Sequence, residues 1–296
     1  MQKKSAVALG YFDGVHLGHR RILGAAAAWA EANGCIPAAF TFHFGEKRTK
    51  GADILTLSER CRRIRGAGAQ RVLCEEFDAI AELSPEEFVE NILCEKLNAA
   101  AVFCGDNFRF GAKAAGDVTL LRSLCAARGI AVQVFPLEES GGEPVSATRI
   151  RGLLERGRIE EANALLGEPY AIDLPVQHGR GVGRTMGFPT VNQIYPPTMQ
   201  RPAQGVYITA AELDGAHVPA ATGIGSRPTV GGHTVTCESF LCRWQGDAYG
   251  AAPRISFYRY LQPVQKFDSV EQLAACIDAA AQASSRYFDE TLTAEK

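Results

Sequence analysis

The chain has 296 residues, of which 46% are hydrophobic and 22% are charged, a mixture typical of folded globular proteins rather than disordered ones. Its 31 Lys and Arg against 33 Asp and Glu give a formal net charge of −2, which provides no general attraction for nucleic acid or an anionic membrane. No apolar run approaches the roughly 20 residues that a membrane helix needs, and the length predicts roughly two domains. The nine cysteines form no CxxC pair and no signal-like segment opens the sequence, so we expect reduced thiols and a cytoplasmic protein.

The first strong motif is the segment LGYFDGVHLGHR at residues 9–20. An apolar run precedes it and apolar residues at helical spacing follow it, so we predict a strand-to-helix turn here. In an open α/β sheet such a turn lies at the carboxyl end of a strand, where the N–H groups that open the helix can receive phosphate. His16 and His19 could bind the charge of that phosphate, or they could be ordinary histidines of a helix start. A metal site is disfavoured, because the pair lacks the third ligand and the glutamate of a helical zinc site.

The rest of the first half alternates apolar strands with amphipathic helices. After the opening helix, which we expect to end near Gly34, strands are predicted at 36–42, 72–74, 100–104 and 130–135. Helices are predicted at about 58–66, 84–97, 117–128, 146–156 and 160–166. Ser84, Pro85 and Glu87 fit the N-cap, N1 and N3 positions of a capping box. The alternation predicts an α/β fold with a doubly wound parallel sheet.

Beyond these helices the pattern changes to short β-type runs punctuated by glycine and proline. Such runs lie at 205–211, 235–242 and 255–260. They predict a smaller antiparallel domain, a barrel or a sandwich, and a β-barrel is our prediction. A helix closes the chain, with Ser269 and Gln272 as a candidate capping box. The domain boundary is expected near Gly167, which gives domains 1–167 and 168–296.

A later helix start offers a second candidate for phosphate binding. Ser146, Thr148, Arg149 and Arg151 lie there together. Hydroxyls and N–H groups at such a position can hold a polyphosphate, and an arginine can counter its charge; an ordinary capped basic helix start is the alternative. Together with HLGH this segment resembles the nucleotidyltransferase superfamily, which carries HxGH early and a Ser/Thr-rich arginine motif late. In that superfamily the α-phosphate of ATP is attacked and pyrophosphate leaves.

The segment GDNFRFG at 105–111 narrows this resemblance. With GYFDGVHLGHR and with SATRIRGLLERGRIEEANALLGEPY at 146–170, it looks like the FMN adenylyltransferase half of bacterial FAD synthetase. The resemblance implies that His16 and His19 bind the phosphates, and that Arg149 grips pyrophosphate. Further ATP or phosphate contacts are implied for Gly10, Phe12, Asp13, Gly14, Ser146, Thr148 and Arg151. Flavin contacts are implied for Asn107, Phe108 and Phe110, while each phenylalanine taken alone fits a core position as well.

These residues suit the implied reaction. FMN already presents a phosphate dianion as the nucleophile, so the enzyme mainly needs alignment and charge neutralisation rather than a strong base. By this resemblance His16 and His19 stabilise the transition state, and Arg149 with Mg²⁺ neutralises the leaving pyrophosphate.

One segment departs from the family pattern. Members commonly have a TFDPHP-like sequence after the second strand, whereas this chain has TFHFGEK at 41–47. The contacts made by the loop at 43–46, including any role of His43, are left open.

The second half carries GRGVGRTMGFPTVN at 179–192. Its glycine-rich amides could cradle a phosphate, although the spacing is not that of a P-loop and a glycine-rich β-turn is the alternative. Thr190 and Asn192 are two residues apart, so on a strand they share a face and could both reach Mg²⁺ or a phosphate. With GVY at 205–207, GIGSRPTVGG at 223–232 and CESF at 237–240, this set resembles riboflavin kinase.

The kinase resemblance implies roles for single residues. Thr190 and Asn192 of its PTxN motif hold Mg²⁺ with ATP, and phosphate contacts are implied for Gly181, Gly183, Arg184, Gly187 and Pro189. Glu238 matches the catalytic glutamate, and a carboxylate base within reach of the attacked hydroxyl makes chemical sense because an alcohol is a poor nucleophile at neutral pH. The chain departs from the family at Arg243, Gln262 and Val264, where an acidic residue, an Arg and a Glu are usual.

The two resemblances cover nearly the whole chain and imply a bifunctional riboflavin kinase and FAD synthetase. The expected substrates are riboflavin, FMN and ATP, with Mg²⁺ as cofactor and with flavins as substrates and products rather than prosthetic groups. No nucleic acid, membrane or protein partner is expected. One alternative is an FAD synthetase with a degenerate flavin-binding kinase domain. A non-enzymatic flavin sensor and another small-molecule nucleotidyltransferase are weaker alternatives, and the latter leaves PTVN and GIGSRPTVGG unexplained.

Overall fold

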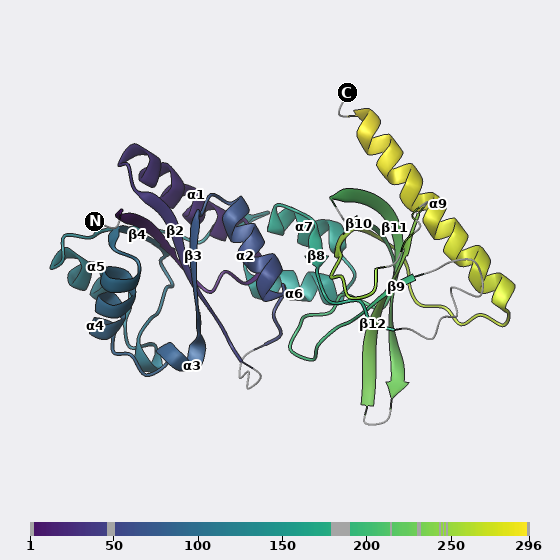
Figure 1. The fold of residues 1–296 in the computed structure, drawn as a ribbon, viewed down its shortest axis with the longest axis horizontal. Helices are drawn as coiled ribbons and strands as arrows, with labels where there is room; N and C mark the ends of the chain where they lie inside the picture. Colours follow the sequence, from purple (N-terminus) through teal and green to yellow (C-terminus); the bar gives the residue numbers. More distant parts are fainter. Residues whose placement is uncertain are drawn as a thin grey trace. The chain divides into compact units, whose positions relative to one another are not determined.

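The computed structural model describes residues 3–45, 51–178, 190–213, 215–229, 232–242, 244, 246 and 248–294. The chain divides into two compact units (Figure 1). The first contains Met1–Gly51 and Leu57–Ala147, and the second contains Ala52–Thr56 and Thr148–Lys296. In the part of the chain that is described, no helix combines the length and the apolar character that a membrane crossing requires.

The first unit is built on a five-stranded sheet in which all neighbouring strands are parallel. Its strands are β1 (Ser5–Leu9), β2 (Ile36–His43), β3 (Arg71–Glu76), β4 (Ala99–Gly105) and β5 (Ala131–Phe135). Their order, β3-β2-β1-β4-β5, reverses direction between β1 and β4, as in doubly wound sheets. The predicted α/β fold is therefore confirmed.

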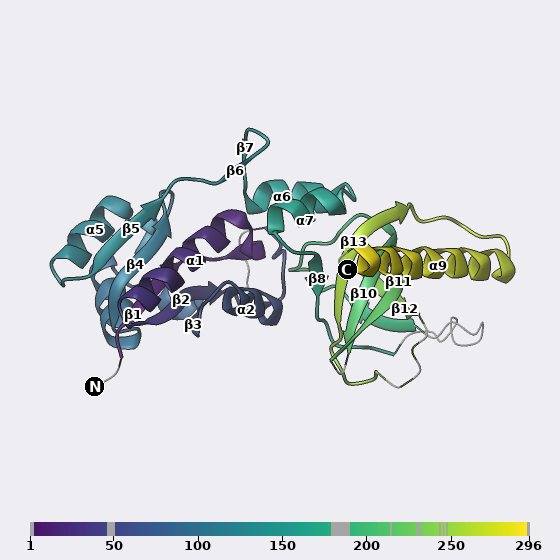
Figure 2. The same cartoon turned by 90° about the horizontal axis from the view of Figure 1, so that it is seen from above.

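Helical segments connect these strands. They are η1 (Asp13–Val15), α1 (Leu17–Ala32), α2 (Leu57–Gly66), α3 (Phe77–Ile80), α4 (Pro85–Glu87), η2 (Phe88–Lys96), η3 (Ala112–Ala114) and α5 (Val118–Ala126). α1 packs against β1, β2 and β4 (Figure 2). A short hairpin, β6 (Glu139–Ser140) and β7 (Glu143–Pro144), comes near the end of the unit.

The predicted capping box is confirmed at the start of α4. Ser84 Oγ accepts a hydrogen bond from the N–H of Glu87 at 3.1 Å, and the Glu87 carboxylate accepts one from the N–H of Ser84 at 2.8 Å. Two backbone donors that a helix start leaves open are thereby satisfied. The helix continues as the π-helical segment η2, which the apolar spacing did not predict.

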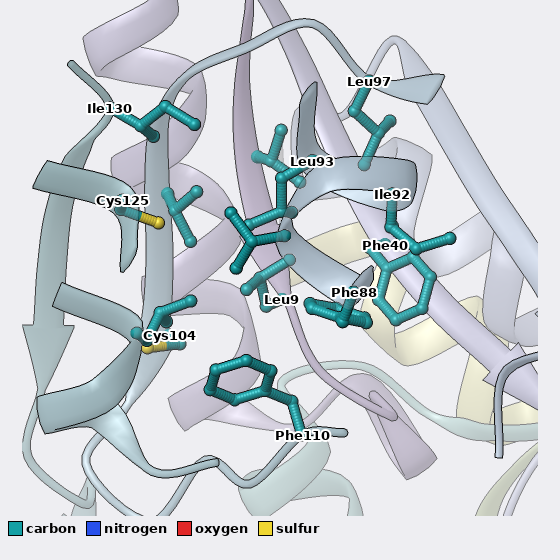
Figure 3. Packing of buried hydrophobic residues seen from close by; sticks show 14 of the residues in the cluster. Leu9, Phe40, Phe88, Ile92, Leu93, Leu97, Cys104, Phe110, Cys125 and Ile130 are labelled. Atoms are coloured by element: carbon teal, nitrogen blue, oxygen red, sulfur yellow. The ribbon is translucent and has the colours of Figure 1, made fainter. Parts of the chain in front are cut away.

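A large hydrophobic cluster of the first unit lies against the sheet, under η2 and α5 (Figure 3). The ring of Phe40 from β2 lies 5.2 Å from that of Phe88, which in turn lies 5.3 Å from that of Phe110. Cys104 and Cys125 belong to the same cluster, where burial raises the pKa of the Cys104 thiol to about 12 and keeps it uncharged. Each large apolar side chain buried in this way contributes roughly 1.5–3 kcal/mol, so the cluster fixes the sheet that carries the loops described below.

The second unit is built on a six-stranded antiparallel sheet with the order β8-β13-β10-β11-β12-β9. Its strands are β8 (Tyr170–Ile172), β9 (Thr190–Ile194), β10 (Gly205–Leu213), β11 (Ala216–Thr229), β12 (Gly232–Leu241) and β13 (Arg254–Gln262). A bridge between Val176 and Gln193 links the chain beyond β8 to β9, so the two edges of the sheet approach each other. The sheet is therefore curved into a half-barrel. The predicted antiparallel β-barrel domain is confirmed in this form.

The described part of the second unit contains the helices α6 (Ala147–Glu155), α7 (Ile159–Leu166) and α9 (Val270–Ala294), and the first residue of α6 still groups with the first unit. Gly167 ends α7 in the left-handed conformation, with φ 76°, as a C-terminal glycine often does. At the start of α9, Ser269 Oγ accepts from the N–H of Gln272 at 3.3 Å, while the Gln272 side chain accepts from Asp268 rather than from Ser269. One of the two hydrogen bonds of the predicted capping box is therefore present, and the other is made by the N–H of Asp268 instead of that of Ser269. α9 packs on β10, β11 and β12.

Candidate functional site

The reversal of strand order between β1 and β4 marks the position in the first unit where a ligand is expected to bind. The HLGH motif follows the carboxyl end of β1, and the GDN segment follows that of β4. A side chain on Gly105 would meet Ile22 of α1 at 4.0 Å, so the end of β4 lies beside the start of α1. The structure thus brings the two predicted segments to the same edge of the sheet.

The loop between β1 and α1 has an unusual backbone. Phe12, Gly14 and Val15 have φ angles of 56°, 82° and 47°, and this left-handed region is costly for a β-branched residue such as Val15. Phe12 and Val15 are fully buried, which holds the loop in this shape. A side chain on Gly10 would lie 2.9 Å from the Phe12 ring. Gly10 and Gly14 therefore make the turn possible, and Asp13, also predicted to contact phosphate, is buried within it.

The two histidines of the motif stack on each other at the start of α1. Their ring centroids are 3.7 Å apart with an interplanar angle of 19°, and the edge of the Phe12 ring supports His19. His16 occupies the N-cap position of α1. In the described part of the chain the Nδ1 atoms of His16 and His19 are buried and have no hydrogen-bond partner. Polar atoms of this kind are available to a ligand.

Burial decides the charge of both imidazoles. It lowers the pKa of His16 to about 4. It also holds the pKa of His19 well below the usual value, with smaller contributions from the neighbouring His16 and from the charge of Arg60. Both rings are therefore neutral at pH 7, and each offers one N–H donor and one acceptor nitrogen. Beside them, the first N–H groups of the 16-residue helix α1 have no acceptor within the helix, so the site is rich in donors for an anion.

The pKa of His16 predicts how stability depends on pH. Between pH 6.5, its usual pKa, and pH 4, the unfolded chain binds a proton at this residue that the folded chain does not bind. Stability therefore falls on acidification through this window and is fully regained above it. The difference corresponds to about 3 kcal/mol. We expect denaturant unfolding to show this loss in the first unit. His16→Gln should lose the part that comes from His16 and keep the part that comes from His19, whose pKa is lowered as well.

A matched control for this prediction is His217→Gln, because His217 is exposed on β11 in the other unit. It should leave the acid-induced loss unchanged. An identical pH dependence in His16→Gln and in the wild-type protein would contradict the assignment of the loss to His16.

Gly18, between the two histidines, permits a close approach of another segment. A side chain on Gly18 would lie 3.3 Å from Glu138 Cβ and 3.5 Å from the His16 ring. The Glu138 carboxylate forms an ion pair of 2.9 Å with Arg21 of α1, and its backbone carbonyl accepts a hydrogen bond of 2.8 Å from the N–H of Val145. The backbone just before Ser146 is therefore hydrogen-bonded to Glu138, the residue that packs against the HLGH turn.

The predicted flavin contacts at 107, 108 and 110 lie in different surroundings. Asn107 is exposed and Phe108 is half-buried. The ring of Phe108 lies parallel to that of Phe110, with centroids 5.9 Å apart. Phe110 is only 5% exposed and belongs to the core (Figure 3). Asn107 and Phe108 are accessible to a ligand. Phe110 instead lies in the core and packs against the ring of Phe108.

Phe42 and Phe44, from the segment that departs from the family pattern, belong to an aromatic cluster at the ends of β2 and β3. The Phe44 ring lies 5.6 Å from Tyr11 and 4.7 Å from Phe77. His43 is the last residue of β2 and pairs with Glu76 of β3. Residues 46–50 lie outside the described part of the chain. Sequence reasoning missed this cluster because its rings come from three separate stretches of sequence.

The helix start at 146–151 is divided between the two units. Ser146 belongs to the first unit, whereas Thr148, Arg149 and Arg151 belong to the second. Within the second unit, Arg151 Nε donates to the carbonyl of Ala52 at 2.8 Å. The phosphate-binding roles of these four residues remain predictions from the sequence.

The second unit contains a cavity of about 310 Å³ on the face of the sheet covered by the first half of α9. Thr190 and Glu238 line it together with Gly223, Gln262 and Val264. Two of the positions at which the chain departs from the kinase pattern thus border this cavity. The third, Arg243, and the predicted phosphate contacts lie outside the described residues, the latter being Gly181, Gly183, Arg184, Gly187 and Pro189.

The strand register brings the predicted kinase residues to one face. Asn192 of β9 lies directly opposite Glu238 of β12. Thr190 and Asn192 are half-buried while Val191 between them is buried, so the two polar side chains share a face as predicted. The amide of Asn192 donates to Thr190 Oγ1 at 3.4 Å, and the hydroxyl of Thr236 donates to Glu238 Oε1 at 3.3 Å. A carboxylate, a hydroxyl and an amide therefore meet beside the cavity.

The two units present different chemistry. In the first, neutral imidazoles and helix N–H groups at a switch point suit the binding of phosphate groups. In the second, a carboxylate beside a largely apolar cavity suits the activation of a substrate hydroxyl. Fold and sites together define an enzyme with two separate centres for phosphate chemistry.

Comparisons with known proteins agree with this division. The family model of FAD synthetase matches residues 1–149, and that of riboflavin kinase matches residues 166–288. A bifunctional riboflavin kinase/FMN adenylyltransferase of Bacillus subtilis (strain 168) is 33% identical over 97% of this chain and 93% of its own length. A protein of the same name from Escherichia coli (strain K12) is 32% identical over 93% of this chain and 90% of its own length. The chain belongs to the bifunctional riboflavin kinase/FMN adenylyltransferase family and contains both domains.

One solved structure extends the similarity to the fold. It is described as a macrolide-efflux protein from Streptococcus pneumoniae and matches with a TM-score of 0.82 and 27% identity. The match covers 96% of this chain and 95% of that one. The same succession of two units is therefore present in a protein of known structure.

Proposed function

We propose that this chain phosphorylates riboflavin to FMN with ATP in its second unit, and joins FMN to the adenylyl group of ATP in its first unit. FAD and pyrophosphate are the products of the second step. The observation that carries the proposal is that each unit, matched by its own family model, also has reactive groups suited to its step on one edge or face. The substrates are then riboflavin, FMN and ATP, and the nine free thiols suit a reducing cytoplasm.

The first unit acts by alignment and by neutralising charge. The FMN phosphate is already an anionic nucleophile, so no strong base is needed at this site. The neutral His16 and His19 can each donate a hydrogen bond to the α-phosphate as charge develops on it, without first losing a proton. Asn107 and Phe108 contact the flavin. The sequence resemblance alone assigns neutralisation of the pyrophosphate to Arg149, with Ser146 and Thr148.

The second unit acts by base catalysis. Glu238 accepts the proton of the riboflavin hydroxyl as that oxygen attacks the γ-phosphate of ATP. The hydrogen bond from Thr236 fixes the orientation of its carboxylate. The apolar lining of the cavity accepts the flavin ring, and Gln262 and Val264 alter its rim without removing the base.

Mg²⁺ fits the donor atoms that β9 presents. The described residues contain no cluster of three His, Cys, Asp or Glu side chains for a metal, and Mg²⁺ characteristically uses one or two protein oxygens with substrate phosphates and water. Thr190 Oγ1 and Asn192 Oδ1 supply oxygens of this kind on one face. When bound there, Mg²⁺ would neutralise charge on the phosphates of ATP.

We place the domain boundary near Gly167. The riboflavin kinase match, which begins at residue 166, supports it. The border between the two compact units of the structure lies earlier, after Ala147, so that α6 and α7 belong to the second unit. A fragment of residues 1–167 that forms FAD from FMN would support the boundary, and an inactive folded fragment would count against it.

The experiment that tests the function uses the full chain with Mg²⁺ and ATP. Given riboflavin, it is expected to form FMN and then FAD, and given FMN it is expected to form FAD and pyrophosphate. The residues at 243, 262 and 264 favour one second candidate, an FAD synthetase with a degenerate kinase domain. No FMN from riboflavin, under conditions where FMN becomes FAD, would support that candidate and overturn the bifunctional proposal.

Gly223 provides a test of the cavity as the riboflavin site. Gly223 is on β11, opposite Glu238 of β12, and a side chain placed on it would meet no atom closer than 4.0 Å. Gly223→Leu should therefore fold normally but fill part of the cavity. We expect it to lower kcat/KM for riboflavin phosphorylation by about 10- to 200-fold, the range for steric changes in apolar pockets. Gly223→Ala should lower it less, and an unchanged KM for riboflavin in Gly223→Leu would contradict the assignment.

A further inference from the structure

A buried arginine lies at the carboxyl edge of the first sheet, in the helix that the sequence predicts at about 58–66. Arg60 of α2 is 2% exposed. Its guanidinium donates to the carbonyl of Tyr11 at 3.3 Å and to that of Phe42 at 2.9 Å. Tyr11 comes directly after β1 and Phe42 near the end of β2. Arg60 therefore lies at the strand ends from which the HLGH loop begins.

The hydrogen bonds of Arg60 leave part of its guanidinium unused. An arginine has five N–H donors, and these two bonds engage only two of them. Its Nε is buried and has no hydrogen-bond partner in the part of the chain that the structure describes. Among the described residues no carboxylate pairs with it, whereas its neighbour Glu59 pairs with Arg62 and Arg63 at 2.7 and 2.6 Å.

A buried charge without a counter-ion is unfavourable unless something else compensates it. The Tyr11 ring does so in part, because the guanidinium carbon lies 4.6 Å from its centroid. The two carbonyls add further partial negative charge. These contacts hold the guanidinium in place and leave it without a full negative charge beside it.

The neighbouring histidines make this positive charge important for the site. His16 and His19 are neutral at pH 7, and the field of Arg60 reaches His19. Fixed positive charge beside the HLGH motif therefore comes from Arg60 rather than from the imidazoles.

We propose that Arg60 is a further substrate-binding residue of the first unit and that its guanidinium contacts a phosphate group during adenylyl transfer. This inference rests on the proposed function and extends it by one residue. The phosphate belongs either to FMN or to the polyphosphate of ATP. Both sources share the same chemistry, an oxyanion that meets the planar N–H fork of arginine.

Three full-length variants test the proposal. Arg60→Gln keeps a donor for the carbonyls but removes the charge, and Arg60→Lys keeps the charge but loses the fork. Arg65→Met is the matched control, because Arg65 is exposed on the same helix. The measurements are kcat and KM for FAD formation from FMN, and the affinities for inorganic pyrophosphate and for FMN.

We expect Arg60→Gln to lower kcat/KM for FAD formation by about 100-fold, and Arg60→Lys to recover at least part of it. Arg65→Met should stay within about twofold of the wild-type protein. A weaker affinity for pyrophosphate assigns the contact to ATP, and a weaker affinity for FMN assigns it to the flavin phosphate. Riboflavin phosphorylation, a reaction of the other unit, should be unchanged in all three.

An Arg60→Gln protein with unchanged affinity for both probes and unchanged kcat/KM overturns the proposal. So does a protein that loses FAD formation but binds both probes normally, because that pattern indicates a structural role. If Arg60→Gln does not fold, the KM values of Arg60→Lys decide, and values unchanged for both substrates overturn the proposal. A wild-type protein that forms no FAD from FMN would instead refute the proposed function, which the probe affinities distinguish from a failure of this inference.

Discussion

Replacing either histidine of HLGH with alanine is expected to lower kcat for FAD formation from FMN by about 10²–10³-fold, the usual effect of removing one transition-state hydrogen-bond donor. The reason is the geometry of the pair. Both rings stack at the start of α1, both are neutral, and both have a buried nitrogen without a partner among the described residues. Steady-state formation of FAD and pyrophosphate measures the effect.

Two comparisons sharpen this prediction. Because the rings support each other, the double variant should lose less than the product of the two single losses. Riboflavin phosphorylation in the same proteins serves as the internal control and should stay near the wild-type rate. A histidine variant that keeps FAD formation within threefold of the wild-type rate would show that this ring does not take part in catalysis.

Glu238→Gln is expected to lower kcat for riboflavin phosphorylation by about 10²–10⁴-fold, the range found when a general base is removed. Glutamine has nearly the same shape and can still accept from Thr236, but its amide cannot take up the proton of the attacking hydroxyl. We propose Glu238 as the base because it lies beside the cavity and opposite Asn192. Initial rates of FMN formation at saturating ATP measure the effect.

The control for this variant is Glu212→Gln, because Glu212 is exposed on β10 of the same sheet. It should leave both reactions unchanged. FAD formation from supplied FMN should also survive in Glu238→Gln, since the adenylyl transfer uses the other unit. Normal FMN formation by Glu238→Gln would exclude Glu238 as the base.

Much of the fold follows from local patterns. The capping box at Ser84 is recognisable because its two hydrogen bonds join residues three apart. The common face of Thr190 and Asn192 follows from the period of a strand. The ring cluster around Phe44 was not predicted, because it depends on packing between segments that are distant in the sequence. The π-helical form of η2 was not predicted either.

The sequence by itself determined the two-part organisation, the family and the motifs HLGH and PTVN, because these depend on residue types at short, fixed spacing. Only the tertiary structure decided that the histidines are neutral, that Glu238 lies opposite Asn192 and that a buried arginine lies behind the first motif. Burial, strand register and electrostatic fields arise from residues far apart in the chain. No local pattern of the sequence contains them.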